Sequence, residues 1–137
     1  MSLSNSSKVE IQKVVRLSYL SKNKGRVFRR IKRLKENLSY YDKLIQDLQH
    51  DIEFECISDV SVEEKVRHFN MLNDILNKRR KTKDMLHFYA LVQNFYKKGI
   101  SKREFSVLKK RVNRFVFKTE NRKYRKRATN RKQKQAV

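Results

Sequence analysis

Apolar residues recur at alternating intervals of four and three along the second quarter of the chain. The series consists of Val27, Ile31, Leu34, Leu38, Tyr41, Ile45, Leu48 and Ile52. Such steps keep side chains on one side of an α-helix, and a sustained run of them is typical of a coiled-coil seam. The pattern predicts a long helix over about residues 26–56, which fits either a coiled coil or an amphipathic helix in an ordinary bundle.

A second long helix is predicted to begin after Ser61 and to end at about Lys98, before Gly99. Its apolar positions are Val66, Phe69, Leu72, Leu76, Leu86 and Ala90, and the apolar face widens near its end at Phe88, Leu91, Val92 and Phe95. Only residues 57–60 connect the two helices, and short connections favour antiparallel neighbours. We therefore expect a helical hairpin in which Glu36 lies beside Thr82.

Three Ser-x-x-Glu patterns mark the starts of predicted helices. They are Ser7/Glu10, Ser61/Glu64 and Ser101/Glu104. In such a capping box the serine hydroxyl accepts a hydrogen bond from a free helix amide, and the glutamate reaches back to the serine amide. Three boxes, each followed by a periodic apolar run, indicate three helix N-termini.

A shorter helix is expected on each side of the hairpin. The N-terminal one spans about residues 8–20, points Val9, Val14, Leu17 and Leu20 inward, and ends at residues 22–25. The C-terminal one follows Ser101 and presents Phe105, Leu108, Val112, Phe115 and Val116 on one side. The fold class is therefore all-α: a long antiparallel, coiled-coil-like hairpin with a short N-terminal helix, a C-terminal helix and a basic tail. We expect a helical domain over residues 1–117 and a basic C-terminal tail over residues 118–137.

The composition points to a polyanionic partner. The 137-residue chain has 36 Lys and Arg against 14 Asp and Glu, a net charge of +22. A field of this strength attracts polyanions, of which nucleic acid comes first and an acidic membrane surface second. No apolar run is long enough to span a membrane, so we expect no membrane partner.

The charges are unevenly distributed along the chain. Residues 1–40 carry eleven basic and two acidic side chains, a net of +9, whereas residues 41–74 carry three and nine, a net of −6. Residues 75–100 carry seven and one, a net of +6, and residues 101–137 carry fifteen and two, a net of +13. Folded as a hairpin, the chain is expected to gather its cations into one basic pole and its acids at the opposite tip, where a protein partner could bind.

Phosphate contact is therefore expected from the basic residues of the pole, the last helix and the tail, because Arg and Lys release counterions from nucleic acid. The candidate nucleic-acid-binding residues are Arg26, Arg29, Arg30, Lys32, Arg33, Lys35, Lys78, Arg79, Arg80, Lys81, Lys83, Lys109, Lys110, Arg111, Arg114, Arg122, Lys123, Tyr124, Arg125, Lys126, Arg127, Arg131 and Lys132. Tyr124, between two cations, is the aromatic residue expected to stack on a base. The other aromatic residues of the basic segments are expected to pack in the core.

No pattern for catalysis or cofactor binding is present. Cys56 is the only cysteine, and His50, His68 and His87 have no second ligand at metal spacing. Nucleophile–base constellations and phosphate-binding glycine loops are missing as well. We expect a protein that is not an enzyme, with no cofactor, metal or small-molecule substrate. The single cysteine fits an intracellular, reducing compartment, and a mitochondrial, plastid, bacterial or phage origin stays open.

Two short segments resemble a known family. The segment 31–38 (IKRLKENL) resembles a helix of the S-fifteen family of small-subunit ribosomal proteins, and the run 78–81 (KRRK) resembles that family's basic second arm. The resemblance covers about a dozen residues and implies a helical hairpin that binds ribosomal RNA. The chain departs from the family pattern in its longer arms and in lacking the polar His/Asp and Ser-Arg-Gly signature between them.

Three functions fit these observations. The leading hypothesis is a non-enzymatic, RNA-binding structural subunit of a ribonucleoprotein, with a ribosomal protein first. The second is a helical DNA-binding regulator or accessory protein of phage or plasmid type, in which the last helix supplies Lys102, Arg103, Ser106, Lys109, Lys110 and Asn113 to a groove. The third is a coiled-coil protein-interaction module.

Overall fold

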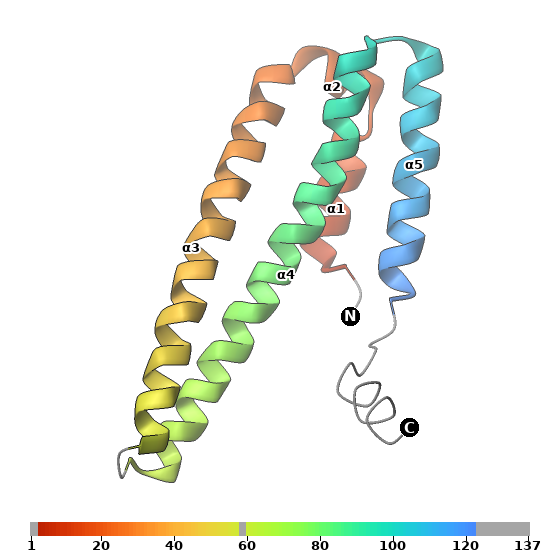
Figure 1. Ribbon diagram of the computed structural model, residues 1–137. Helices are drawn as coiled ribbons and strands as arrows, with labels where there is room; N and C mark the ends of the chain where they lie inside the picture. Colours follow the sequence, from red (N-terminus) through yellow and green to blue (C-terminus); the bar gives the residue numbers. More distant parts are fainter. Residues whose placement is uncertain (1–2, 58–59, 123–137) are drawn as a thin grey trace, which may run out of the picture.

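The computed structural model describes residues 3–57 and 60–122, and this part of the chain is helical without any strand. Its five helices are α1 (Asn5–Val14), α2 (Leu17–Lys22), α3 (Lys24–Ile57), α4 (Val62–Lys98) and α5 (Lys102–Glu120) (Figure 1). The two longest, α3 and α4, pack against each other as an antiparallel hairpin. The all-α hairpin predicted from the sequence is confirmed.

The apolar seam of α3 faces α4 as predicted. Val27, Ile31, Leu34 and Leu48 are buried, and the other four members of the series are partly buried. Across the hairpin, Arg79 Nε donates to Asp42 Oδ1 at 2.6 Å. The predicted register places Arg79 beside residue 39, so the observed pairing differs by three residues, which is less than one helical turn.

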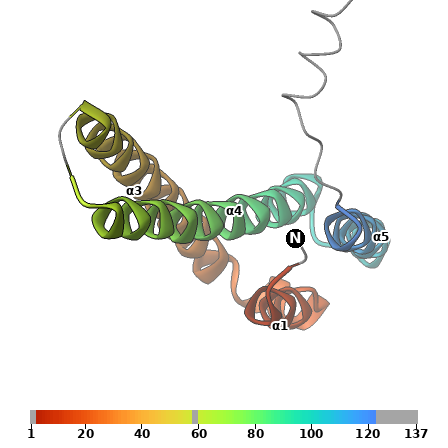
Figure 2. The same cartoon turned by 90° about the horizontal axis from the view of Figure 1, so that it is seen from below.

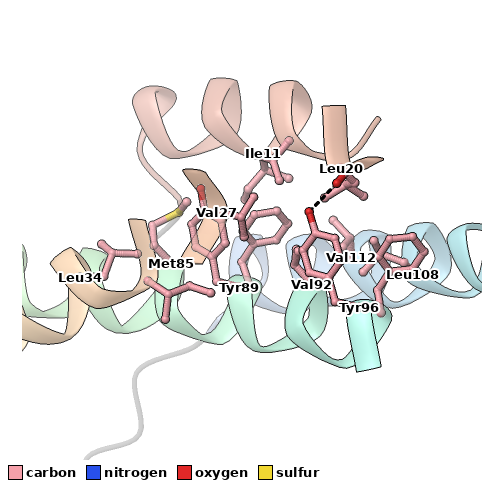
Figure 3. Packing of buried hydrophobic residues seen from close by; sticks show 14 of the residues in the cluster. Ile11, Leu20, Val27, Leu34, Met85, Tyr89, Val92, Tyr96, Leu108 and Val112 are labelled. Atoms are coloured by element: carbon pink, nitrogen blue, oxygen red, sulfur yellow. Dashed lines mark hydrogen bonds between the residues drawn. The ribbon is translucent and has the colours of Figure 1, made fainter. Parts of the chain in front are cut away.

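The molecule divides into a base, to which all five described helices contribute, and an arm formed by α3 and α4 alone. We call the arm residues 41–57 of α3 and 62–78 of α4, and the base the rest of the described chain. The base holds one core in which α1, α2 and α5 pack against the hairpin (Figures 1 and 2). Figure 3 shows part of this core, whose buried apolar members are Leu3, Ile11, Val14, Leu20, Val27, Ile31, Leu34, Met85, Phe88, Tyr89, Val92, Phe95, Tyr96, Leu108 and Val112. The fold is therefore anchored at the base, from which the arm projects.

The N-terminal segment forms two helices instead of the one that the sequence predicts. The chain leaves helical geometry at Arg16 (φ −140°, ψ 130°), which separates α1 from α2. The break allows Leu20 to enter the core, where its carbonyl oxygen accepts a hydrogen bond from the Tyr96 hydroxyl at 2.7 Å. Val9, predicted to point inward, is 64% exposed, and Ile11 takes the buried position with Val14.

The predicted seam of α4 is partly wrong. Leu72 and Leu86 are half-buried, but Val66, Phe69, Leu76 and Ala90 are exposed. The residues of α4 that are buried ahead of its widened face are Ile75, Thr82, Asp84 and Met85. The predicted seam residues are exposed because the packing at the base sets the direction of every α4 side chain. There Phe88, Val92 and Phe95 are buried and fix the rotation of α4 about its axis. A continuous helix carries that rotation into the arm, where it turns the predicted seam toward solvent.

Two of the three predicted capping boxes have their serine at the helix start. Ser61 Oγ accepts from the Glu64 amide at 3.3 Å, and Ser101 Oγ accepts from the Glu104 amide at 3.2 Å. At the N-terminus the cap is Ser4 instead of Ser7, and Ser4 Oγ accepts from the Ser7 amide at 3.2 Å.

The two glycines behave differently. Gly99 ends α4 as predicted, with a positive φ of 96° that side chains other than hydrogen rarely allow. Gly25, predicted to help break the chain, lies inside the first turn of α3, and only Asn23 separates α2 from α3.

The last helix, α5, buries the predicted face. Leu108 and Val112 are buried, and Phe105, Phe115 and Val116 pack partly buried against the core. The helix continues to Glu120, so its last turn includes residues that the composition assigns to the tail. Within the described residues, no helix combines the length and the apolar character that a membrane crossing requires.

Candidate nucleic-acid interface

A groove of about 930 Å³ lies between α4 and α5 on the surface of the base. Six of its lining residues are basic and one is acidic. The basic residues are Arg80, Lys83, Arg111, Arg114, Lys118 and Arg122, and the acidic residue is Asp84. We call this feature the cationic groove.

Helical spacing places these side chains together. On α4, Arg80, Lys83 and His87 follow at intervals of three and four, and on α5 Arg111, Arg114 and Lys118 repeat the same intervals. Residues three or four apart share one side of a helix. Because α4 and α5 are joined by a short turn at Gly99 and run side by side, the two basic rows face the same groove (Figure 1).

The floor of the groove is apolar and aromatic. The His87 ring stacks on Phe115, with ring centroids 5.2 Å apart and planes inclined by 21°. Leu38, Leu86 and Leu91 also line the groove. The cations therefore stand above an apolar surface that keeps the two helices in contact.

Asp84 neutralises one end of the groove. Its carboxylate accepts two hydrogen bonds from the Arg122 guanidinium, Nη2–Oδ1 at 2.7 Å and Nη1–Oδ2 at 3.4 Å. Arg80 Nε lies 3.9 Å from the same Oδ1. The side chain of Asp84 is only 11% exposed, so its charge is held by these two arginines and is not presented to a ligand.

Four cations of the groove have no acidic partner in the part of the chain that the structure describes. Among the described residues, Lys83, Arg111, Arg114 and Lys118 form no ion pair. Unpaired Arg and Lys side chains lose no existing contact when they bind phosphate, and they displace condensed counterions from a nucleic acid. The groove is therefore chemically suited to a phosphate backbone.

A second basic surface lies between α1, α2 and α3. Its lining includes Lys13, Arg26, Arg29, Arg30 and Arg33, and it shares no residue with the cationic groove. The sequence predicts one basic pole, and the structure instead separates the cations of α3 from those of α4 and α5. The reason is the direction in which each helix presents its side chains: the α3 cations of this second surface project toward α1, whereas the α4 cations of the groove project toward α5. We call this second feature the α1–α3 surface.

The remaining candidate residues are dispersed. Lys32, Lys35, Lys81, Lys109 and Lys110 are exposed but line neither surface.

Two further candidates are held in ion pairs within the protein. Arg79 is bound to Asp42. Lys78 Nζ lies 3.1 Å from Asp74, and the hydrogen bond to that carboxylate raises the pKa of Lys78 above its ordinary value. The tail candidates Lys123, Tyr124, Arg125, Lys126, Arg127, Arg131 and Lys132 lie outside the described residues.

Sequence reasoning missed three residues of these surfaces. Lys118 was assigned to the tail by composition, although its spacing from Arg111 and Arg114 continues their helical row. His87 and Lys13 belong to no basic run of the sequence. Only the fold brings His87 to the groove and Lys13 to the α1–α3 surface. Extending the helical periodicity past residue 117 identifies Lys118 from the sequence alone.

The comparisons with known proteins give no independent indication of function. The sequence matches no protein-family model, and comparisons with curated proteins and with solved structures found no significant match. The resemblance to the S-fifteen family therefore stays a prediction. Among the side chains that the structure describes, no group of three or more His, Cys, Asp or Glu residues could hold a metal ion.

Proposed function

We propose that this chain is an RNA-binding structural protein of a ribonucleoprotein particle, without enzymatic activity, and we favour the ribosome as that particle. The observation that carries the proposal is the cationic groove, where Lys83, Arg111, Arg114 and Lys118 face one channel and have no acidic partner among the residues that the structure describes. A groove of this kind supplies affinity for a phosphate backbone without reading base sequence. The apolar floor holds the spacing of the two helices fixed.

RNA is favoured over DNA by the arrangement of α4 and α5. A helix-turn-helix reader places its two helices at a steep angle, so that the second can enter a major groove. Here α5 runs back antiparallel alongside α4 (Figure 1). The DNA-binding hypothesis requires residues such as Lys109 and Asn113. They lie on α5, one of the two helices that form the groove, but they do not line the groove. Structured RNA, recognised through shape and phosphates, fits this arrangement better.

The proposal is tested with a double substitution in the groove, Arg111→Gln/Lys118→Gln. The matched control is Lys102→Gln/Lys109→Gln on the same helix. Lys109 and Arg111 are two positions apart, which places their side chains about 200° apart around the helix axis. Both variants remove two positive charges, so the net charge falls equally from +22 to +20.

Binding to a structured RNA and to a DNA duplex of equal length is measured by fluorescence anisotropy at several salt concentrations. We expect the groove variant to bind the RNA about tenfold or more weakly, because each lost phosphate contact removes counterion release. The control variant is expected to bind almost as well as the unmodified protein. Equal losses in both variants contradict the groove as the site. Equal affinity for RNA and duplex DNA contradicts the RNA preference.

A second candidate function, docking of a basic protein partner on the arm, is favoured by an exposed apolar row. Val62, Val66, Phe69 and Leu76 are all exposed, and their spacing places them on one side of α4. Val62, Val66 and Phe69 lie within the acidic segment 41–74, whose net charge is −6, and Leu76 follows just after it. An apolar row with acidic surroundings fits the apolar face of a basic amphipathic helix.

This second function is tested with two helical peptides of the same apolar pattern, one with Lys and one with Glu at its polar positions. Only the Lys peptide is expected to bind, although the whole protein carries a charge of +22 that repels it. Val66→Ser/Phe69→Ser should abolish binding, and the matched control Phe117→Ser, at another exposed apolar residue, should preserve it. Binding that survives the arm substitutions contradicts this function.

A further inference from the structure

The α1–α3 surface has a basic row of its own. Arg26, Arg29 and Arg33 follow at intervals of three and four along α3, and all three are exposed. Lys13 of α1 lies on the other side of the same pocket of about 210 Å³, with its ammonium 5.9 Å from the centre of the Tyr19 ring. Two helices thus present cations to one surface, as α4 and α5 do in the cationic groove.

The single acidic residue of the α1–α3 surface is internally neutralised. Glu10 accepts hydrogen bonds from the Tyr89 hydroxyl at 2.8 Å and from Arg30 Nε at 3.4 Å, and Arg30 Nη2 lies 3.1 Å from its second oxygen. Among the described residues, Lys13, Arg26, Arg29 and Arg33 form no ion pair. Glu10 therefore orders Arg30 and α1, and leaves the other four cations available.

The two basic surfaces lie on opposite sides of α4. His87 lines the cationic groove, and Tyr89 lines the α1–α3 surface. Residues that lie two positions apart on an α-helix, as these two do, point in directions about 200° apart around its axis. Tyr89 points from α4 toward α1 (Figure 3), and the fully buried Phe88 lies in the core. One phosphate strand in the groove cannot also occupy the other surface without passing around the base.

We infer that the base binds two phosphate backbones at once, one on each side of α4, and so bridges two RNA segments. The inference rests on the proposed RNA-binding function and adds a second site to it. Two RNA segments repel each other, and a layer of cations on both sides of one rigid helix removes this repulsion for both. A protein of this kind stabilises the packing of RNA helices against each other.

Bridging is measured with two identical RNA hairpins, one carrying a donor dye and the other an acceptor dye. Energy transfer is recorded as the full-length protein is added, and the mass of the complex is followed by sedimentation. We expect transfer at a ratio of one protein to two RNAs, from a complex that contains a single protein copy. Excess protein should abolish the transfer, because each RNA then binds its own protein.

Substitutions on each side separate the two sites. Arg26→Gln/Arg33→Gln on the α1–α3 surface and Arg111→Gln/Lys118→Gln in the groove should each reduce energy transfer about tenfold, while each variant still binds one RNA. Lys102→Gln/Lys109→Gln, which removes the same charge, should leave the transfer unchanged.

Four outcomes overturn the inference. Energy transfer that survives in the Arg26→Gln/Arg33→Gln variant assigns bridging to another part of the chain. Transfer that requires two protein copies assigns it to dimerisation. Tight binding of one RNA without transfer leaves the proposed function standing and rejects the second site, whereas no binding of any RNA rejects both.

Discussion

Arg122 and Asp84 are 38 residues apart in sequence and are joined by two hydrogen bonds, the shorter of them 2.7 Å long. Arg122 follows the end of α5, and Asp84 lies in the middle of α4. The pair therefore fastens the C-terminal end of α5 to α4, at the end of the cationic groove farthest from Gly99. The turn at Gly99 and this ion pair together hold both ends of the groove.

Substituting Arg122 should therefore destabilise the fold more than substituting its neighbour in the groove. Arg122→Gln leaves a carboxylate that is 11% exposed without its main partner, and the free energy of unfolding should fall by about 2 kcal/mol. Lys118→Gln, which removes the same charge from an exposed side chain, should change it by less than about 0.5 kcal/mol. Urea denaturation followed by circular dichroism measures both. Equal stability of the two variants contradicts a structural role for the pair.

The Tyr89 hydroxyl should make the protein sensitive to alkaline pH. Burial raises the pKa of Tyr89 above its ordinary value, and the hydrogen bond to the Glu10 carboxylate raises it further. The folded chain therefore keeps this proton at pH values where the unfolded chain, with a tyrosine pKa of about 10, has lost it. The contribution of Tyr89 to stability is complete below pH ~10 and declines as the pH rises above that value.

The measurement is the free energy of unfolding between pH ~9 and ~11.5. Burial also raises the pKa of Tyr96, so the unmodified protein should lose stability through both residues. Tyr89→Phe should cost about 1 kcal/mol at neutral pH and should flatten the alkaline decline. Tyr40→Phe, at an exposed ring, is the control and should keep the original slope. An unchanged slope in Tyr89→Phe contradicts this assignment.

The hairpin was predictable because its signals are local and repeated. The helix signals depend only on residues a few positions away: the heptad steps run from Val27 to Ile52, and Ser61 and Ser101 cap the helices that follow them. The sequence alone therefore places α3, α4 and α5. The N-terminal break at Arg16 is not marked by such a signal. It lets the Leu20 carbonyl meet the Tyr96 hydroxyl, a contact across 76 residues that no local pattern encodes.

The site was predictable in composition but not in arrangement. Sequence counting identifies Arg80, Lys83, Arg111 and Arg114, and the structure gathers them in one groove. Counting charges in the sequence cannot show that Arg79, which lies next to Arg80, is bound to Asp42. The direction in which each cation projects depends on the rotation of α4 about its axis, which is fixed by the burial of Phe88 and other core residues at the base. The cations that the sequence assigns to one basic pole are therefore divided between the cationic groove and the α1–α3 surface.

The two glycines should respond in opposite ways to alanine. An added Cβ meets nothing within 4 Å at either position, so only the backbone conformation distinguishes them. Gly99 has a φ of 96°, and Gly99→Ala should cost about 2 kcal/mol. Gly25 lies in α3, and Gly25→Ala should stabilise by about 0.5 kcal/mol because it lowers the entropy of the unfolded chain. Thermal unfolding of both variants checks the signs, and destabilisation by Gly25→Ala contradicts a helical residue 25.

Lys83 and Arg79 provide the sharpest test of whether free cations, rather than net charge, bind RNA. They lie four positions apart on α4, and Lys83→Gln and Arg79→Gln lower the net charge of the protein equally. Lys83 lines the groove and has no acidic partner within residues 3–54 and 60–122, whereas Arg79 is bound to Asp42 at 2.6 Å. We expect Lys83→Gln to reduce the slope of log affinity against log salt by about 0.7–0.9, which corresponds to one phosphate contact. Arg79→Gln should leave that slope nearly unchanged, because its guanidinium is already occupied. Identical slopes for the two variants mean that RNA responds to the overall field of the protein and not to the groove.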